Sequence, residues 1–189
     1  MILAGGLSRR MGGGDKCLLP LGDRPLLAHV IERLRPQTAA LALNANGDAT
    51  RFARFGLAIV ADDATDFAGP LAGILAAMDW AARLQPAAKA VLTVPADTPF
   101  LPRDLVTRLS AAGTPALARS GGRIHPVVGL WPLALRDDLR RSLREAGVRK
   151  VEAWTLRLDP AIVDFEAGAI DPFFNINTPE DLTRAEALL

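Results

Sequence analysis

The sequence has only one cysteine, two histidines and almost no excess of charge of either sign. The single cysteine, Cys17, allows neither a disulfide within the chain nor a cluster of thiolate metal ligands. Neither His29 nor His125 is surrounded by residues that would suggest a catalytic triad. The net charge of +1 argues against a protein dedicated to nucleic acids, because such proteins need surplus lysine and arginine to neutralise phosphates. We therefore expect a function without a nucleic-acid partner.

The sequence also lacks a long apolar run. Its most apolar stretch, residues 71–82, is too short to span a bilayer and contains Asp79. No basic segment followed by an apolar one opens the chain, as it would in a secretory leader. We therefore expect a cytoplasmic protein without a membrane partner. Half of the residues are hydrophobic, which excludes a disordered chain, and a length of 189 residues fits one domain spanning residues 1–189.

Short apolar runs alternate with helically periodic segments along the chain. The runs predict strands at residues 2–4, 39–43, 57–60, 90–94, 115–119, 124–131 and 162–165. The periodic segments predict helices at residues 25–34, 71–84, 104–111, 133–146 and from 179 onward. This alternation predicts an α/β fold with a mostly parallel sheet. Such sheets bind ligands beyond the carboxyl ends of their strands, which draws attention to the loops after Ala4, Leu43, Val60 and Val94.

The first of these loops, residues 5–16, is rich in glycine and in cations. These residues are Gly5, Gly6, Gly12, Gly13 and Gly14, together with Arg9, Arg10 and Lys16. Glycine lets backbone N–H groups approach an anion closely, and the cations offset phosphate charge. The loop is neither a P-loop, which needs Gly-Lys-Ser/Thr, nor a dinucleotide fingerprint. We interpret it as a different kind of triphosphate site.

A carboxylate, Asp97, stands directly after the strand predicted at residues 90–94, with a proline on either side of it. This position suits Mg²⁺, which usually takes only one or two protein carboxylates beside substrate phosphates. The other interpretation is a helix cap, but Asp104 lies nearer to the next predicted helix and is better placed to cap it.

Two further loops carry polar side chains. Asn44 and Asn46 follow the second predicted strand, and Asp62 and Asp63 follow the third. These groups can bind a base or a ribose, or they can simply stabilise turns, and the residues by themselves leave both interpretations open.

A final polar segment precedes the last predicted helix. Thr178 is a good N-cap and Pro179 suits the first helical position. We expect the side chains of Asn175 and Asn177 to point to opposite faces of an extended segment. One of them would then face the site as an oxygen ligand to Mg²⁺ or as a donor to phosphate.

The lack of a triad fits a nucleophile that needs no base. A phosphate monoester is already largely a dianion at neutral pH, because its second pKa is about 6. Catalysis of its attack on an α-phosphate would rest on positioning and on neutralisation of charge.

Taken together, these motifs resemble the molybdenum cofactor guanylyltransferases, within the wider group of Rossmann-like nucleotidyltransferases. Residues 3–16 (LAGGLSRRMGGGDK) are similar to the signature loop of that family. The similarity continues, in the expected order, through Asn44-Ala45-Asn46, Asp62 with the Gly-Pro-Leu-Ala-Gly that follows, Asp97-Thr98-Pro99, and residues 175–182 (NINTPEDL). The resemblance implies a three-layer fold with helices on both faces of a mostly parallel central sheet that contains an antiparallel strand.

The resemblance further implies transfer of GMP from GTP to the terminal phosphate of molybdopterin, with release of pyrophosphate and a requirement for Mg²⁺. By position, the implied catalytic residues are Arg10, Lys16 and Asp97, with Asp97 also the metal ligand. The implied nucleotide contacts are Leu3, Ala4, Gly5, Gly6, Lys16, Asn44, Asp62 and Asp97. Asn175 and Asn177 would complete the second-substrate or metal side. The partners would be GTP and molybdopterin, with transient contacts to cofactor-synthesis proteins and molybdoenzyme chaperones.

Two other functions remain as alternatives to guanylyl transfer. A cytidylyltransferase of the same cofactor tends to have Leu-Ala-Ala-Gly where this chain has Leu3-Ala4-Gly5-Gly6, and the additional glycine leaves room for a purine. A non-catalytic module that delivers nucleotide or cofactor would not require both Lys16 and Asp97.

The sequence departs from the family pattern at its start, because only Met1 and Ile2 precede Leu3, where the family usually has several more residues. We expect a short first strand, and a protein less stable than one extended at its N-terminus.

Overall fold

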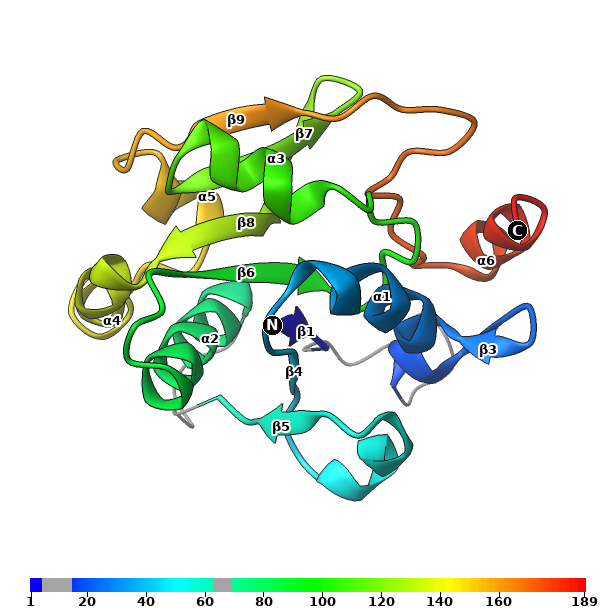
Figure 1. The fold of residues 1–189 in the computed structure, drawn as a ribbon, viewed down its shortest axis with the longest axis horizontal. Helices are drawn as coiled ribbons and strands as arrows, with labels where there is room; N and C mark the ends of the chain where they lie inside the picture. Colours follow the sequence, from blue (N-terminus) through cyan, green and yellow to red (C-terminus); the bar gives the residue numbers. More distant parts are fainter. Residues whose placement is uncertain (5–14, 63–68) are drawn as a thin grey trace.

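The computed structural model describes residues 1–4, 15–62 and 69–189 (Figure 1). Its centre is a seven-stranded sheet in the order β5-β4-β1-β6-β8-β7-β9. The strands are β1 (Ile2–Leu3), β4 (Ala42–Asn44), β5 (Ala58–Val60), β6 (Ala90–Pro95), β7 (Ala116–Ser120), β8 (Arg123–Pro132) and β9 (Ala161–Asp164). Strand β8 pairs antiparallel with β6 and β7, and the other pairs are parallel. The predicted sheet is confirmed, including its antiparallel strand and the β7–β8 hairpin.

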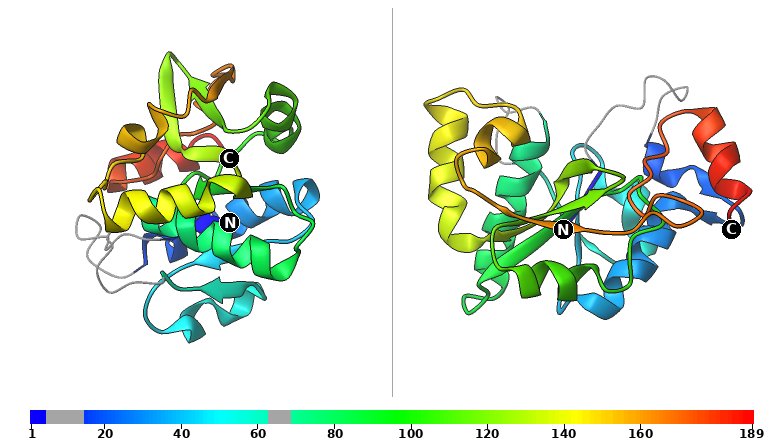
Figure 2. Two further views of the ribbon diagram at one scale, coloured as in Figure 1. Left: turned by 90° about the vertical axis from the view of Figure 1, so that its left-hand side faces the viewer. Right: turned by 90° about the horizontal axis from the view of Figure 1, so that it is seen from above.

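Helices cover both faces of this sheet, as Figure 2 shows. They are α1 (Leu26–Leu34), α2 (Pro70–Leu84), α3 (Leu105–Ala112), α4 (Arg136–Arg144), α5 (Val151–Thr155) and α6 (Pro179–Glu186). Apolar residues of α1 and α3 pack on one face with Ile2, whereas those of α2, α4 and α5 pack on the other face with Leu3. Successive residues of a strand point to opposite faces, so the two residues of β1 serve two separate cores. The three-layer fold is confirmed.

Shorter elements connect these layers. They are the 3₁₀ helices η2 (Lys16–Leu18), η3 (Arg35–Gln37), η4 (Ala49–Phe55) and η5 (Leu133–Leu135), and the hairpin β2 (Pro20–Leu21) and β3 (Arg24–Pro25). Leu21 of this hairpin packs with Ile176 and with Ala185 of α6 in a third, smaller apolar cluster. Figures 1 and 2 place α6 beside the hairpin, at the end of the sheet toward which β6 points. The last helix thereby brings the segment before it to the carboxyl ends of the strands.

The helix predicted over residues 133–146 is shorter than expected. It consists of η5 followed by α4, which ends at Arg144. Gly147 then adopts a positive φ of 61°, and the backbone N–H of Val148 donates to the carbonyl of Ser142 at 3.1 Å. This closing turn ends the helix where the apolar period alone does not.

Helix α5 was missed because five residues are too few to show a period. Its Trp154 is fully buried and packs on Trp131 of β8, with 5.3 Å between the ring centroids. Tertiary packing therefore holds this segment in a helix. The second strand also begins later than predicted, at Ala42, because Ala39 and Ala40 are exposed.

The cap predicted for α3 is only partly right. Asp104 occupies the N-cap position, but its side chain makes no capping hydrogen bond. Its carboxylate lies 3.9 Å from the guanidinium of Arg108 instead. None of the helices in the described residues is long and apolar enough to cross a membrane.

Strand β1 is central although it has only two residues. It pairs with β4 on one side and β6 on the other, so the strand order reverses at this point. The amino group of Met1 is buried and donates to the carbonyl of Leu92 at 2.7 Å. Burial lowers the pKa of this amino group from 8.0 to about 5. Open α/β sheets bind ligands where the strand order reverses, so the carboxyl ends of β1, β4 and β6 mark the expected site.

Candidate active site

The register of the central strands brings three sequence motifs to one edge of the sheet. Leu3 pairs with Asn44 on one side and with Pro95 on the other. The backbone N–H of Ala4 donates to the carbonyl of Asn44 at 2.9 Å, and that of Ala96 donates to the carbonyl of Leu3 at 3.0 Å. The predicted nucleotide contacts Leu3, Ala4 and Asn44 therefore lie beside the loop that carries Asp97.

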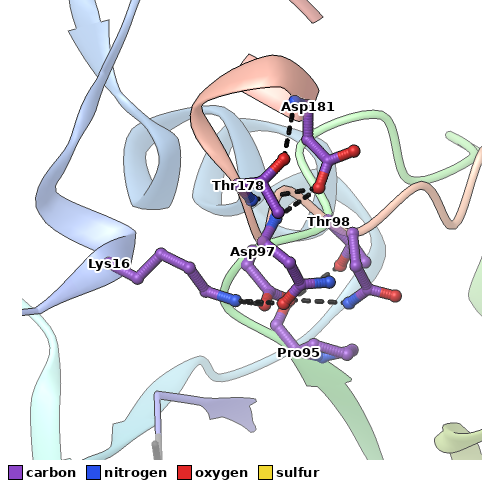
Figure 3. Close-up of polar contacts among 8 residues, drawn as sticks. Lys16, Pro95, Asp97, Thr98, Thr178 and Asp181 are labelled. Carbon is purple, nitrogen blue, oxygen red and sulfur yellow. Dashed lines mark hydrogen bonds and ion pairs between the residues drawn. The ribbon is translucent and has the colours of Figure 1, made fainter. Parts of the chain in front are cut away.

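Asp97 is the centre of a four-residue group that we call the cation cluster: Lys16, Asp97, Asn175 and Asn177. The Lys16 ammonium forms an ion pair with Oδ2 of Asp97 and donates to Oδ1 of Asn177 at 2.7 Å. The Nδ2 group of Asn175 donates to Oδ1 of Asp97 at 2.8 Å (Figure 3). The structure thus joins Lys16, the last residue of the predicted loop, with the loop after β6 and the segment before α6 in one polar site.

The expectation that Asn175 and Asn177 point to opposite faces is wrong. Side chains two positions apart on an extended segment share a face, and the residue between them points the other way. That residue, Ile176, is fully buried in the small apolar cluster, and its backbone N–H donates to the carbonyl of Asp97 at 3.1 Å. Both asparagines therefore face Lys16 and Asp97.

Local hydrogen bonds hold the two loops of the cation cluster in place. The hydroxyl of Thr98 donates to the carbonyl of Pro95 at 2.9 Å, which closes the turn after β6. The cap predicted at Thr178 is confirmed, because its Oγ1 accepts from the backbone N–H of Asp181. The carboxylate of Asp181 accepts in return from the backbone N–H groups of Asn177 and Thr178, each at 3.0 Å (Figure 3). Such a capping box fixes the entry into α6.

A second polar group, which we call the amide turn, consists of Asn44, Asn46 and Asp62. The two carboxylate oxygens of Asp62 accept one hydrogen bond each, from Nδ2 of Asn44 and from Nδ2 of Asn46, both at 2.8 Å. The backbone N–H of Asp62 donates to Oδ1 of Asn46 at 2.9 Å. The residues thus stabilise one another's turns, which is one of the two interpretations left open by the sequence; the other, contact with a nucleoside, stays a prediction.

The glycine-containing start of α2 packs against this turn. A Cβ added at Gly73 would lie 2.7 Å from Oδ1 of Asn44 and 3.2 Å from a methyl group of Leu3. Only glycine allows the helix to come this close. Gly73 therefore positions two predicted nucleotide contacts through direct packing.

Arg51 of η4 is a residue that the sequence reasoning missed. Its Nη2 group donates to the carbonyl of Asn46 at 2.6 Å, and its Nε lies 2.5 Å from Oδ2 of Asp15 in an ion pair. The guanidinium also lies over the ring of Phe52, 4.7 Å from its centroid. Arg51 therefore joins the amide turn to the residue that precedes Lys16. No pattern in the sequence separates Arg51 from Arg54, which lies over the ring of Phe55 in the same 3₁₀ helix.

A hydrogen-bonded chain of His125, Ser120 and Asp171 holds the turn that precedes Asn175 of the cation cluster. The hydroxyl of Ser120 donates to Oδ1 of Asp171 at 2.7 Å and is 2.7 Å from Nε2 of His125, which makes Nε2 the donor to the hydroxyl. Burial lowers the pKa of His125, against the opposing effect of the Asp171 carboxylate. The histidine stands at the end of this chain and not between the serine and the acid, so the group holds the turn before Asn175 and is no catalytic triad.

Cys17 is not a nucleophile in this site. Burial and the nearby Asp15 carboxylate raise the pKa of its thiol to about 12. The thiol is therefore protonated at neutral pH. Within residues 1–4, 15–62 and 69–189, no group of three or more His, Cys, Asp or Glu side chains could hold a metal ion. Gly5, Gly6, Arg10 and Asp63 lie outside the described residues.

Residues 1–160 match the family model described as the MobA-like NTP transferase domain. The chain belongs to this family. A molybdenum cofactor guanylyltransferase of Bradyrhizobium sp. (strain ORS 278) is 56% identical over 193 residues, which cover 100% of this chain and 91% of that protein. A protein of the same name from Rhodopseudomonas palustris (strain BisB5) is 53% identical, over 100% of this chain and 92% of that protein. The family resemblance found in the sequence is confirmed, and this MobA-like chain is a nucleotidyltransferase.

Solved structures share the fold. The molybdopterin-guanine dinucleotide biosynthesis protein A of Archaeoglobus fulgidus superposes with a TM-score of 0.72 at 23% identity, over 99% of this chain and 96% of that one. A Mycobacterium tuberculosis protein solved as a complex with manganese superposes with a TM-score of 0.69 at 18% identity, over 100% of this chain and 97% of that one. At such identities the likeness concerns the fold of the MobA-like domain alone.

Proposed function

We propose that this protein transfers GMP from GTP to the terminal phosphate of molybdopterin, releases pyrophosphate and depends on Mg²⁺. The observation that carries the proposal is the cation cluster at the carboxyl end of β6, beside the amide turn, in a chain 56% identical to a molybdenum cofactor guanylyltransferase. The reaction would take place in the cytoplasm, with transient contacts to cofactor-synthesis proteins and molybdoenzyme chaperones.

The two polar groups suit the two parts of a nucleotide. The amide turn presents amides and one carboxylate, which recognise a base edge or ribose hydroxyls through hydrogen bonds. Leu3 and Ala4 lie next to it and would contact the same part. Lys16 presents an ammonium that would bind phosphate oxygens, and Arg10 would act with it as a phosphate clamp.

The residues around Asp97 fit a divalent cation. The carboxylate already holds a cation, the Lys16 ammonium, and the amide oxygen of Asn177 faces that same cation. Carboxylate and amide oxygens are the ligands that hard divalent ions prefer, and Mg²⁺ usually needs only one or two of them beside phosphates. When bound, Mg²⁺ neutralises charge on the triphosphate. The relative solved with manganese supports a divalent ion in this fold.

The proposed transfer needs no protein base. An oxygen of the acceptor's terminal phosphate forms a bond to the α-phosphorus of GTP, while the bond from that phosphorus to the bridging oxygen breaks and pyrophosphate leaves. The acceptor phosphate is largely a dianion at neutral pH and attacks as it stands. Lys16 would position the triphosphate and offset its charge, and Asp97 would hold the divalent ion beside it. Positioning and neutralisation of charge are the terms that dominate phosphoryl transfer.

The test is pyrophosphate release with each of the four ribonucleoside triphosphates, with and without molybdopterin. The proposal predicts release that requires both GTP and molybdopterin. Preference for CTP would replace guanylyl by cytidylyl transfer, the alternative that the additional glycine in Leu3-Ala4-Gly5-Gly6 disfavours. Tight nucleotide binding without turnover would instead indicate a delivery module.

A further inference from the structure

Both carboxylate oxygens of Asp97 are engaged in this structure. Oδ2 pairs with the Lys16 ammonium, and Oδ1 accepts from the amide of Asn175 at 2.8 Å. The side chain of Asp97 is 15% exposed and that of Lys16 is 20% exposed. The ion pair is therefore largely withdrawn from water, where the attraction between its charges is less screened.

The two asparagines face this ion pair with opposite polarity. An ammonium can only donate and a carboxylate can only accept, so the partners decide which amide atom faces each of them. Asn177 turns its oxygen toward Lys16, whereas Asn175 turns its nitrogen toward Asp97. Two oxygens, Oδ2 of Asp97 and Oδ1 of Asn177, thus converge on the position of the Lys16 nitrogen. That donor set suits a metal ion as well as an ammonium.

We propose that Lys16 is a cation placeholder: its ammonium lies between Asp97 and Asn177 in the nucleotide-free protein, and it turns to the triphosphate when nucleotide and divalent ion bind. The inference rests on the proposed function and concerns the order of events at the same site. An ammonium and a divalent ion on one carboxylate repel each other strongly. The incoming phosphates offer Lys16 a new counter-charge, and Asn175 remains on Asp97 as a positioning residue.

The placeholder makes nucleotide and metal binding cooperative. Lys16 competes for Asp97 while the nucleotide is absent, so the free protein binds a divalent ion weakly. A triphosphate that draws Lys16 away raises the metal affinity of Asp97, and by linkage the metal raises the nucleotide affinity by the same factor. The protein would thus bind the two ligands together.

The test uses Mn²⁺ as the probe and measures its binding to the nucleotide-free protein by electron paramagnetic resonance. Lys16→Met removes the competing charge, and we expect it to tighten Mn²⁺ binding by about tenfold, the factor that corresponds to about 1.4 kcal/mol. Lys89→Met is the matched control, because Lys89 directly precedes β6 whereas Asp97 follows the other end of that strand. It makes the same change of charge and should leave Mn²⁺ binding unaltered.

The direction in which Lys16→Met changes the Mn²⁺ affinity separates the placeholder role of Lys16 from a purely structural role. Lys16→Met should tighten Mn²⁺ binding and at the same time weaken the binding of metal-free GTP, whereas a loosened site would weaken both. In the Lys16→Met background, Asn177→Ala should weaken Mn²⁺ binding because it removes one of the two oxygens. Mn²⁺ affinity that is unchanged or weaker in Lys16→Met would overturn the placeholder, and no effect of Asn177→Ala would overturn the assignment of the two oxygens.

Failure of this inference can be told apart from failure of the proposed function, because the Mn²⁺ measurement involves neither nucleotide nor turnover. Tighter Mn²⁺ binding in Lys16→Met, together with transfer of CMP in the wild-type protein, would support the placeholder and refute guanylyl transfer. Unaltered Mn²⁺ binding together with GTP-dependent transfer would do the reverse.

Discussion

The amide turn and the cation cluster lie at the same edge of the sheet but are built differently. The amide turn joins residues at most 18 positions apart, Asn44, Asn46 and Asp62, and its Asp62 carboxylate accepts from the neutral amides of the two asparagines. The cation cluster joins residues 161 positions apart, Lys16 and Asn177, around a full ion pair. The first is suited to recognition by hydrogen bonds, and the second to an exchange of cations. Changes in one group should therefore leave the other largely intact.

The largest expected effect comes from breaking the cation cluster. Asp97→Asn removes the carboxylate but keeps the shape of the side chain, and we expect GMP transfer to fall by about 10³-fold, as when a group that stabilises charge in the transition state is lost. Binding of metal-free GTP should not weaken, because the variant also frees Lys16 from its ion pair. Steady-state kinetics and equilibrium binding measure the two quantities.

The control for this variant is Asp104→Asn, which alters an exposed carboxylate at the start of α3. It should leave transfer and binding unaltered. Substantial Mg²⁺-dependent transfer by Asp97→Asn would contradict the role assigned to Asp97.

The next effect concerns β1, the strand that lies between the two groups. The amino group of Met1 has its pKa lowered by burial from 8.0 to about 5, so between these values the unfolded chain binds this proton more readily than the folded protein. The free energy of unfolding should therefore fall as the pH falls from 8 to 5.5, by about 3 kcal/mol from this group, since one pKa unit corresponds to about 1.4 kcal/mol.

A variant with added residues that continue β1 replaces the amino group by an amide. The amide cannot take up the proton, so the extended chain should be more stable and should lose this part of the pH dependence. Urea unfolding at both pH values measures the difference between the two chains. Equal free energies of unfolding for the two chains at both pH values would argue against a cost of burying the amino group.

A smaller effect is expected from the amide turn. Asp62→Asn cannot accept from both Asn44 and Asn46, and we expect the dissociation constant of metal-free GTP to rise about tenfold, the range that corresponds to one hydrogen bond to a charged group. Mn²⁺ binding to the nucleotide-free protein should stay the same. If Asp62→Asn weakened Mn²⁺ binding as much as GTP binding, the two groups would not be independent.

The smallest effect is expected at the link between the groups. Arg51→Met breaks the contacts with Asp15 and Asn46 and should raise the KM for GTP about threefold to tenfold, with little change in kcat, because it loosens the binding site before chemistry begins. Arg54→Met is the matched control: it removes a guanidinium from the same 3₁₀ helix and should leave KM unaltered. An equal rise of KM in both variants would assign the effect to the net charge alone.

The same contrast shows what could be predicted from the sequence. The strands of the sheet and the start of α6 were recognisable because apolar periods and the Thr178-Pro179 cap are local signals. Asp97 was recognisable because it directly follows a buried strand. The residues of the amide turn and of the cation cluster belong to the family motifs. The sequence therefore identified these residues, but not the hydrogen bonds and the ion pair that connect them.

The rest depends on contacts that have no local signal. Arg51 resembles Arg54 in the sequence and differs from it through its contacts with Asp15 and with the carbonyl of Asn46. Helix α5 exists because Trp154 packs on Trp131, and the chain from His125 to Asp171 requires the β7–β8 hairpin to meet the turn before Asn175. The shared face of Asn175 and Asn177 was within reach of the sequence, because the alternation of side chains along an extended segment already predicts it.

The most direct test of GMP transfer to molybdopterin uses GTP labelled at one of its phosphates. With GTP labelled at the α-phosphate, the account predicts that the label enters a molybdopterin-containing product in amounts equal to the pyrophosphate released. Label placed at the γ-phosphate should appear only in pyrophosphate. Transfer of label from CTP but not from GTP, or no labelled product from either nucleotide, would contradict the account.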